Sequence, residues 1–507
     1  MASRVLGLAR EAVVVALFPK EAVDAFQTAF LIPNTFRRLT GEGAFSPAVV
    51  SVFTKIWTAG DREESRRFVR SVTGFSLVFL AVLTLAGVLG AEPLTWLATW
   101  GSGGHGDKYL LAVRLTRFMF PYILFISLTA LAMGILNSTG RFFAPSFAPV
   151  LLNVSIIGCA AGLTGTFPGW GIDPIFSIAV GVLIGGVAQA AFQLPSLRSV
   201  GLLLRPSIDF KYKELRKVLR LTAPMILGAA SYQVGIIFNT ALAWTLPDGS
   251  VMYINSANRL IELPLAVLVM AISIAALPNL SALFGAGKVK EMKEAYAHAL
   301  KLALYVATPA MIALIVLAEP ILAILYQRGH FTYAETLKTV PALQVAALGI
   351  CSMAFVRQTV PVFYALENSK IPMLMTMVFV VANGAAGFLL KGPFLHVGLC
   401  MAISIAPTVQ GIGLVVMLRR RIGRIGFKGV LKSWALALIA CVPMGGAAYA
   451  ISTFGRWPAG GNSPRNILVL LAAVAVGLAT FVAASFVLKI PEFMALKGAF
   501  VRKRRAS

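Results

Sequence analysis

Apolar residues fill long, nearly uninterrupted runs of the chain, and short polar stretches separate these runs. Several runs, for example FSLVFLAVLTLAGVLGA and ILVLLAAVAVGLATFVAASFVL, approach or exceed the ~20 residues that a helix needs to cross a ~30 Å hydrocarbon core. Strands of a transmembrane barrel would instead alternate apolar and polar residues over ~10 positions. The pattern therefore predicts an all-α polytopic membrane protein.

We predict about fourteen transmembrane helices from these runs. Their expected positions are 1–18, 23–53, 71–91, 111–136, 145–163, 175–196, 218–246, 251–284, 301–318, 338–364, 372–390, 397–418, 433–452 and 466–488.

Lysine and arginine are distributed unevenly between the loops on alternate sides of these helices. One set of loops holds about thirty of them and the opposite set holds about six, so the positive-inside rule places the first set and both termini in the cytoplasm. The basic run RRRIGR at 419–424 is then an orientation signal, and no nucleic-acid partner is expected.

Composition agrees with this topology and excludes several kinds of site. The chain of 507 residues is 58% hydrophobic and 13% charged, with a net charge of +25, and its mean hydropathy is +0.82. The four cysteines lie alone in apolar segments, and the four histidines lie in loops or at helix ends. Neither pattern fits a metal or haem site, so no metal and no cofactor are expected.

The sequence repeats weakly at an offset of 227 to 231 residues. AEP recurs at 91–93 and 318–320, Pro145 corresponds to Pro372, and SPAVVSVF at 46–53 parallels LPNLSALF at 277–284. We expect two six-helix parallel repeats, as in transporters that rock two lobes around a site at their interface.

The repeat predicts the domain organisation and one shortened element. The expected parts are an N-lobe at 1–196, a basic cytoplasmic linker at 197–217, a C-lobe at 218–418 and, at 419–507, two added helices with a basic cytoplasmic tail. The first helix is expected to be truncated, because its counterpart in the second repeat is preceded by a longer basic run.

Ten charged residues lie inside or close to the apolar segments. They are Arg4, Arg10, Glu11, Asp24, Arg37, Arg38, Glu42, Arg259, Glu262 and Arg357. A charge near the bilayer centre costs at least ~2.5 kcal/mol, so such residues usually face a wet cavity or a partner. One interpretation is buried ion pairs, since Arg38 and Glu42, Arg259 and Glu262, and Arg4 and Glu11 share helix faces.

The other interpretation is an anion site, because arginines outnumber carboxylates in this set. Arginine stays charged when buried, and its planar fork of donors matches phosphate oxygens. In IPNTFRRLTGEGAF, residues 32–45, the proline and glycines predict an interrupted helix, which is tolerated where it lines a cavity. No nucleotide-binding loop is present to suggest ATP as the energy source.

Four stretches resemble the lipid II flippase family, MurJ or MviN, of the superfamily that also holds multidrug exporters. They are SRVLGLAREA at 3–12, VDAFQTAFLIPNTFRRLTGEGAFSPA at 23–48, FPYILFISLTALAMGILNSTGRFFAPSFAPVLLN at 120–153 and SANRLIELP at 256–264. The resemblance implies fourteen helices, with a final pair forming a groove for a lipid tail. It also implies a cell-wall precursor, the undecaprenyl-diphosphate-linked disaccharide peptide lipid II, as substrate in the bacterial inner membrane.

The resemblance also implies roles for single residues. Arg4, Arg10, Arg37 and Arg259 match the family's cavity arginines, which makes them the expected substrate-binding residues. Glu11, Asp24, Arg38, Glu42, Glu262 and Arg357 are the expected supporting charges. Asn258 departs from the aspartate common in relatives, and Asn239 and Asn383 offer only amides, so sodium coupling has no support from the sequence.

The favoured function is a lipid II flippase that works by alternating access and supports peptidoglycan synthesis and cell shape, with membrane lipids around a monomer. The alternatives are a flippase for another polyprenyl-linked glycan and a cation-coupled drug antiporter, which would need embedded carboxylates for a cationic substrate. An enzyme acting on polyprenyl phosphates would need clustered catalytic acids, histidines or metal ligands. The arginine excess argues against the antiporter, and the sequence has no such cluster, so we expect no enzymatic activity.

Overall fold

The computed structural model describes residues 2–39, 45–100, 106–203, 205–207, 209 and 211–495, and the chain divides into two compact units, residues 1–252 and 253–507. The described residues form helices joined by turns, with no strand among them beyond an isolated bridge between Arg328 and Phe331. The predicted all-α fold is therefore confirmed.

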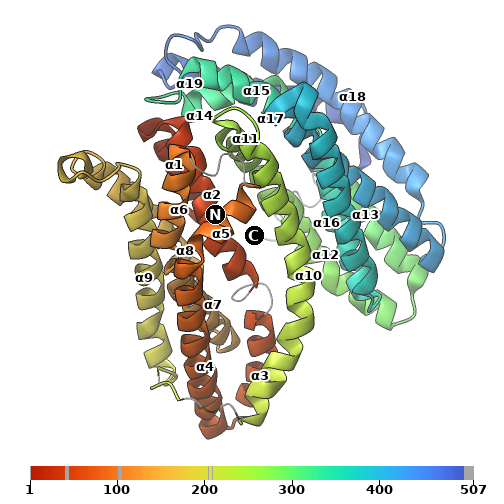
Figure 1. Ribbon diagram of the computed structural model, residues 1–507. Coiled ribbons are helices and arrows are strands. Elements are labelled where there is room, and N and C mark those ends of the chain that lie inside the picture. The colour runs from red at the N-terminus through yellow and green to blue at the C-terminus, as the bar shows by residue number, and fades with distance from the viewer. Residues whose placement is uncertain are drawn as a thin grey trace. The chain divides into compact units, whose positions relative to one another are not determined.

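Among its described residues, the first unit holds ten α-helices and one 3-10 turn (Figure 1). These are α1 (Ala2–Leu17), α2 (Lys20–Arg37), α3 (Phe45–Thr58), α4 (Arg62–Leu89), α5 (Ala91–Ala98), α6 (Asp107–Met119), α7 (Tyr122–Ser138), α8 (Phe143–Leu163), η2 (Phe167–Trp170), α9 (Phe176–Ser199) and α10 (Lys213–Trp244).

The second unit continues from α11, whose first residues belong to the first unit. Its elements are α11 (Ser250–Pro264), the π-helical turn η3 (Leu265–Val269), α12 (Met270–Gly285), α13 (Val289–Val316), α14 (Ala318–Tyr326), α15 (Tyr333–Ala347), α16 (Ile350–Ala365), α17 (Lys370–Ile422), α18 (Phe427–Ser452) and α19 (Pro464–Val487).

Helix bounds recur along the chain at the offset found in the sequence. The helices α4 and α13 are each 28 residues long and begin 227 residues apart, and the short helices α5 and α14 that follow them also begin 227 residues apart. Further along, α6 and α7 meet at a bend of 45°, and α15 and α16 meet at a bend of 40°. This recurrence supports the two-fold repeat, whose lobe boundary and symmetry axis stay predictions.

A defect in the helical backbone recurs at the same offset. Arg38 and Leu39 continue α2 as π-helical backbone, and the π-helical turn Leu265–Val269 separates α11 from α12. The sequence predicts interruptions at both places from nearby proline and glycine, and Pro264 directly precedes the second turn. Residues 40–44 lie outside the described part of the chain, so the glycines expected there are not described.

The two segments expected at 372–390 and 397–418 are two helices that meet at a sharp break near the middle of α17. Leu395 has φ 50° and ψ −134°, which is not helical. Close packing at the break requires glycine, because a Cβ at Gly398 would lie 2.2 Å from the Leu390 carbonyl oxygen. The chain thus reverses within a few residues rather than through an open loop.

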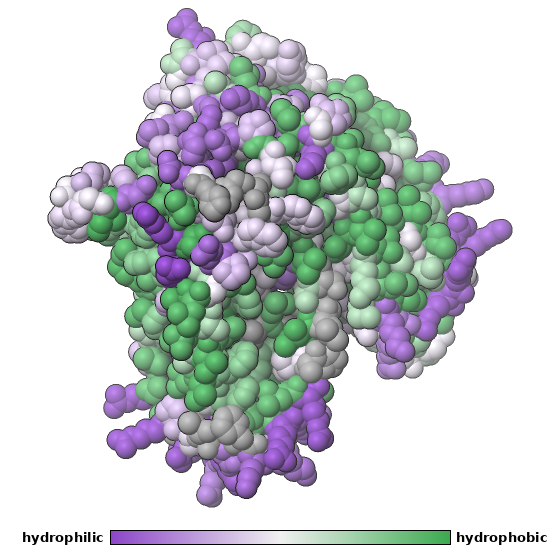
Figure 2. Space-filling view, viewed as in Figure 1, coloured by the Kyte–Doolittle hydropathy of each residue, from purple (hydrophilic) through white to green (hydrophobic). Residues whose placement is uncertain are grey.

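The long helices carry apolar side chains on their outer faces, as a bilayer requires. Leu89 on α4 and Val487 on α19 are 73% and 75% exposed, and Figure 2 shows hydrophobic residues over much of the visible surface, with hydrophilic ones gathered in patches towards helix ends. In the described ranges, eight helices are long and apolar enough to span a membrane, or up to ten if each bent pair is one span. The count of fourteen stays a prediction.

The added pair, α18 and α19, packs against α13 through a core that includes Tyr305, Ala440, Met444 and Phe481 (Figure 1). The Tyr305 hydroxyl donates to Ser485 Oγ at 3.0 Å. This contact fixes the end of α19 beside the middle of α13.

Candidate functional site

The first unit carries three of the four expected substrate-binding arginines. Arg4 and Arg10 lie on α1, and Arg37 is the last residue of α2. Leu17 and Lys20 are the ends of α1 and α2 on the side with few basic residues. At 1.5 Å per residue from these ends, Arg10 lies ~10 Å and Arg4 ~20 Å along α1, and Arg37 lies ~25 Å along α2. The backbone of Arg10 and Arg4 therefore lies well inside a ~30 Å hydrocarbon layer, and that of Arg37 lies near its far face.

Glu11 connects α1 to α2 beside these arginines. Its carboxylate lies 3.7 Å from the Arg10 guanidinium and accepts a hydrogen bond of 2.6 Å from Gln27 Nε2 on α2. The Arg10 and Glu11 side chains are only 13% and 10% exposed, so the pair is shielded from bulk water. Arg10 is held at a defined place between the two helices.

Arg38 is exposed on the π-helical end of α2. Its expected partner, Glu42, lies outside the described residues. The expected pairing of Arg38 with Glu42 therefore stays a prediction.

Asp24 on α2 anchors the beginning of α11. Its side chain is 1% exposed; Oδ2 accepts from Gly249 N, and Oδ1 accepts from Met252 N, both at 2.8 Å. The first amides of a helix have no acceptor within the helix, and a carboxylate there also suits the helix dipole. Asp24 thus fixes the start of the helix that carries Arg259.

Lys108, at the start of α6, neutralises Asp24. Its Nζ donates to Asp24 Oδ2 at 2.9 Å and to Asp248 Oδ1 at 2.8 Å. It also lies 4.5 Å from the centre of the Trp244 ring, and the Trp244 indole N–H donates to Thr28 Oγ1 on α2 at 2.7 Å. The cluster joins α2, α6, the end of α10 and the start of α11 inside the first unit.

Sequence reasoning did not single out Lys108. The residue follows Asp107 at a helix start, where a lone lysine is normally a solvated loop charge. One available signal was its position in a set of loops that contains few cations. Its partners are 84 and 140 residues away, so no local spacing reveals them.

The second unit carries the fourth arginine, Arg259. It is half-buried on α11, nine residues after Ser250 and therefore ~14 Å along the helix. Glu262, its expected partner three residues on, is exposed, and within the described ranges neither side chain makes an ion pair. The spacing allowed that pair but did not produce it.

The π-helical turn after Arg259 is braced by α16. Gln358 Nε2 donates to the Val269 carbonyl oxygen at 3.0 Å, and Ser273 Oγ donates to the carbonyl oxygen of Arg357 at 2.8 Å. The first bond satisfies a carbonyl of the irregular turn, which is what permits such a turn inside a membrane-spanning segment, and the second ties α12 to α16. Arg357, an expected supporting charge, lies on the bracing helix.

Metal-binding side chains do not cluster in the part of the chain that the structure describes. Within those ranges, no three His, Cys, Asp or Glu residues come close enough to hold an ion. The chemistry that the described charges offer is binding, chiefly of anions by guanidinium groups.

Comparison with known proteins places this geometry in a family. The family model described as Lipid II flippase MurJ matches residues 13–462. The chain is 32% identical over 498 residues to "Probable lipid II flippase MurJ" of Vibrio cholerae, covering 95% of this chain and 92% of that protein. It is 31% identical over 479 residues to "Lipid II flippase MurJ" of Burkholderia cenocepacia, covering 94% and 92%.

Solved structures share the fold. "Lipid II flippase MurJ, inward closed conformation" superposes with a TM-score of 0.78 at 23% identity, covering 96% of each chain. An inward-facing multidrug resistance MATE family transporter of the MOP superfamily superposes with a TM-score of 0.72 at 19% identity, covering 83% of this chain and 95% of that one. With the family match and the curated relatives, these similarities show that the chain belongs to the lipid II flippase MurJ family.

Proposed function

We propose that the protein moves lipid II, the undecaprenyl-diphosphate-linked peptidoglycan precursor, from the cytoplasmic to the periplasmic leaflet of the bacterial inner membrane. The observation that carries this proposal is Arg259, a half-buried cation on a membrane-spanning helix that makes no ion pair within the described residues. Burying such a charge is costly unless an anion arrives to neutralise it.

The diphosphate of the substrate fits that requirement. Arg10, Arg37 and Arg259, with Arg4 in support, would each offer a fork of N–H donors to phosphate oxygens. Glu11 would keep Arg10 in place through its contacts with Arg10 and Gln27. Asp24 would act indirectly, because it already binds Lys108 and the first amides of the helix that carries Arg259.

Transport requires that binding favour one arrangement of the two lobes over another. Arginines on both lobes would repel one another in a closed, empty site, and an anion between them would remove that repulsion. Release towards the periplasm then returns the lobes to the inward-facing arrangement. No bond is made or broken in this cycle, so the protein would be a transporter and not an enzyme.

The lipid tail would lie against the added pair, α18 and α19. The outward face of α19 is apolar, with Leu468 and Leu478 67% and 58% exposed. A polyprenyl chain remains in the hydrocarbon layer while its head group crosses, and such a face lets the chain slide at little cost. We propose that the protein works as a monomer with both termini in the cytoplasm.

Complementation of a host depleted of its own lipid II flippase tests the proposal. Arg37→Ala and Arg259→Ala should each abolish growth while membrane abundance, measured by immunoblot, stays normal. Lysine at either position should restore growth only in part, because lysine keeps the charge but loses the fork.

The control is Arg420→Ala, which removes an exposed arginine at the end of α17 and should support normal growth. Full growth with both Arg37→Ala and Arg259→Ala would contradict the anion site. Loss of folded protein in those variants would favour the alternative interpretation, in which the arginines form structural ion pairs.

A further inference from the structure

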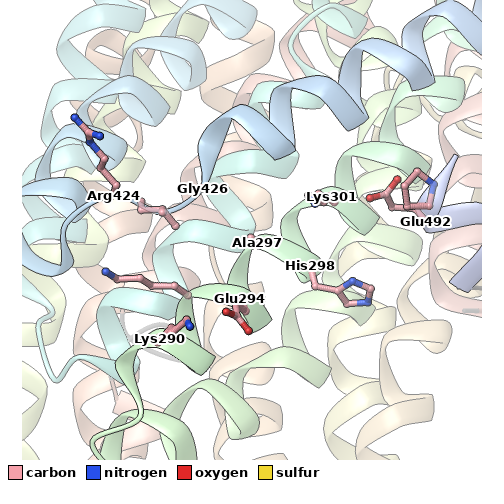
Figure 3. A pocket seen from close by; sticks show the side chains of 11 residues that line it. Lys290, Glu294, Ala297, His298, Lys301, Arg424, Gly426 and Glu492 are labelled. Carbon is pink, nitrogen blue, oxygen red and sulfur yellow. The ribbon is translucent and has the colours of Figure 1, made fainter.

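A second basic site lies within the second unit, away from the arginines described above. A pocket of about 550 Å³ opens between the first turns of α13, the turn joining α17 to α18, and the residues that follow α19. Its charged lining consists of Lys290, Lys293, Glu294, Lys301, Arg424 and Glu492 (Figure 3).

The charges of this pocket are not satisfied by one another. Four cations face two carboxylates, and none of the six makes an ion pair or a hydrogen bond within the described part of the chain. A hollow with two surplus positive charges attracts anions, and its low-dielectric walls strengthen that attraction. The arrangement fits a phosphate group better than a neutral ligand.

Glu492 adds a second requirement to the ligand. The residue is 3% exposed, and its Oε2 is buried with no donor within hydrogen-bonding distance among the described residues. Figure 3 shows its carboxylate directed towards Lys301, while Arg424 and Lys290 lie on the opposite side of the pocket. A buried carboxylate oxygen without a donor is costly, so the ligand should carry an N–H or O–H group beside its phosphate.

Glycines lie beside two of the lysine side chains of the pocket. Gly423 and Gly426, in the turn before α18, have φ of +76° and +69°, a backbone conformation that favours glycine. A Cβ at Gly423 would lie 3.7 Å from Lys293 Nζ, and one at Gly429 would lie 3.6 Å from Lys301 Nζ. These distances place both ammonium groups beside the turn that precedes α18 and the first turn of α18.

The position of the pocket indicates an amphiphile. The pocket lies at helix ends that the charge pattern assigns to the cytoplasmic side, where phospholipid phosphates are found. Apolar residues flank it, since Phe427 begins α18 and the exposed side chains of Phe486 and Val487 end α19. A head group in the pocket would leave its acyl chains beside these residues.

We propose that this pocket binds the phosphodiester head group of a membrane phospholipid. The phosphate contacts Lys293 and Arg424, and a hydroxyl or amine of the same head group donates to Glu492. The bound lipid holds the start of α13 to the turn before α18 and to the segment after α19. This inference goes beyond the proposed function, because it needs neither lipid II nor the arginines of the anion site.

Lipid binding to the delipidated full-length protein in detergent tests the phosphate contacts. The probe is phosphatidylglycerol, measured by native mass spectrometry. The double variant Lys293→Gln and Arg424→Gln should bind it at least tenfold more weakly. The matched control, Lys428→Gln and Lys432→Gln, removes two exposed lysines outside the pocket and should change binding less than twofold. Equal weakening in both double variants would overturn the proposal, since it would indicate general charge attraction.

Two zwitterionic lipids test the role of Glu492 at constant net charge. Phosphatidylethanolamine offers N–H donors and phosphatidylcholine offers none. The wild type should therefore bind phosphatidylethanolamine with about fivefold or higher affinity than phosphatidylcholine, where a tenfold difference in affinity corresponds to roughly 1.4 kcal/mol. Glu492→Ala should remove the preference, and thermal unfolding should confirm that this variant is folded. An unchanged preference would contradict the assignment. Displacement of the lipid by millimolar inorganic phosphate would show a free-anion site and overturn the lipid proposal.

Discussion

The contacts of Asp24 lead to a local prediction about α11. The Asp24→Ala substitution removes the acceptor of the Gly249 and Met252 amides, each held at 2.8 Å. A hydrogen bond to a charged group contributes about 1.5–3 kcal/mol. Since 1.4 kcal/mol is a tenfold change in an equilibrium constant, local opening at these amides should become about 10- to 150-fold more favourable.

Hydrogen–deuterium exchange with mass spectrometry measures this effect on a peptide spanning 246–254. Asp24→Asn should give a smaller increase, because its amide can accept from one backbone N–H but points its own donors at the other. Peptides from α8, which lies outside the cluster, should exchange as in the wild type and show that the unit remains folded.

Asp248→Asn provides the matched control. The Asp248 side chain is 50% exposed and forms an ion pair with Lys108, so its loss should change exchange by threefold at most. Unchanged exchange at 246–254 in Asp24→Ala would refute the anchoring role of Asp24. So would an equal acceleration in the Asp248 control.

Three further predictions concern other parts of the fold. Asn466 is fully buried; its Oδ1 accepts from the Arg456 amide, and its Nδ2 donates to the carbonyl oxygens of Arg456 and Gly460. Asn466→Ala should therefore destabilise the α18–α19 loop by about 2–3 kcal/mol, which limited proteolysis would measure. Leu395→Gly should stabilise the protein by about 1–2 kcal/mol and raise its melting temperature, because it relieves the positive φ; a lower melting temperature would contradict this. The Tyr212 hydroxyl donates to Glu64 at 2.5 Å, and burial with that bond raises its pKa. Because the folded pKa is raised, this stabilisation is present below the ordinary tyrosine pKa of about 10 and is lost as pH rises above it. Tyr212→Phe should therefore remove an alkaline step from the stability profile.

The pattern of apolar runs and helix breakers predicted most of the fold. Membrane-spanning helices follow from length and hydropathy alone, and the interruption next to Pro264 follows from the backbone chemistry of proline. The sharpness of the break between the runs at 372–390 and 397–418 was not predictable. It depends on close packing of Gly398 against Leu390, a contact that hydropathy does not record.

The candidate site was predicted less completely. Arginine excess and family resemblance selected Arg10, Arg37 and Arg259, because embedded cations are rare and visible in a sequence. Lys108 and the basic pocket were missed, since each joins residues far apart in the chain by folding alone. Spacing along one helix also allowed a pair, Arg259 with Glu262, that is not formed within the described residues.

The recurring π-helical turns bear on the predicted two-fold repeat. One turn begins at Arg38 within a charged stretch, and the other begins at Leu265 within the apolar stretch LAVLV. The two starting positions are one repeat offset apart, but the side chains around them differ in chemistry. This recurrence is what the predicted two-fold repeat would produce: the irregular path of the main chain occurs at both places, while the side chains around it differ. In such a repeat, each half can carry its own charges on a shared backbone path.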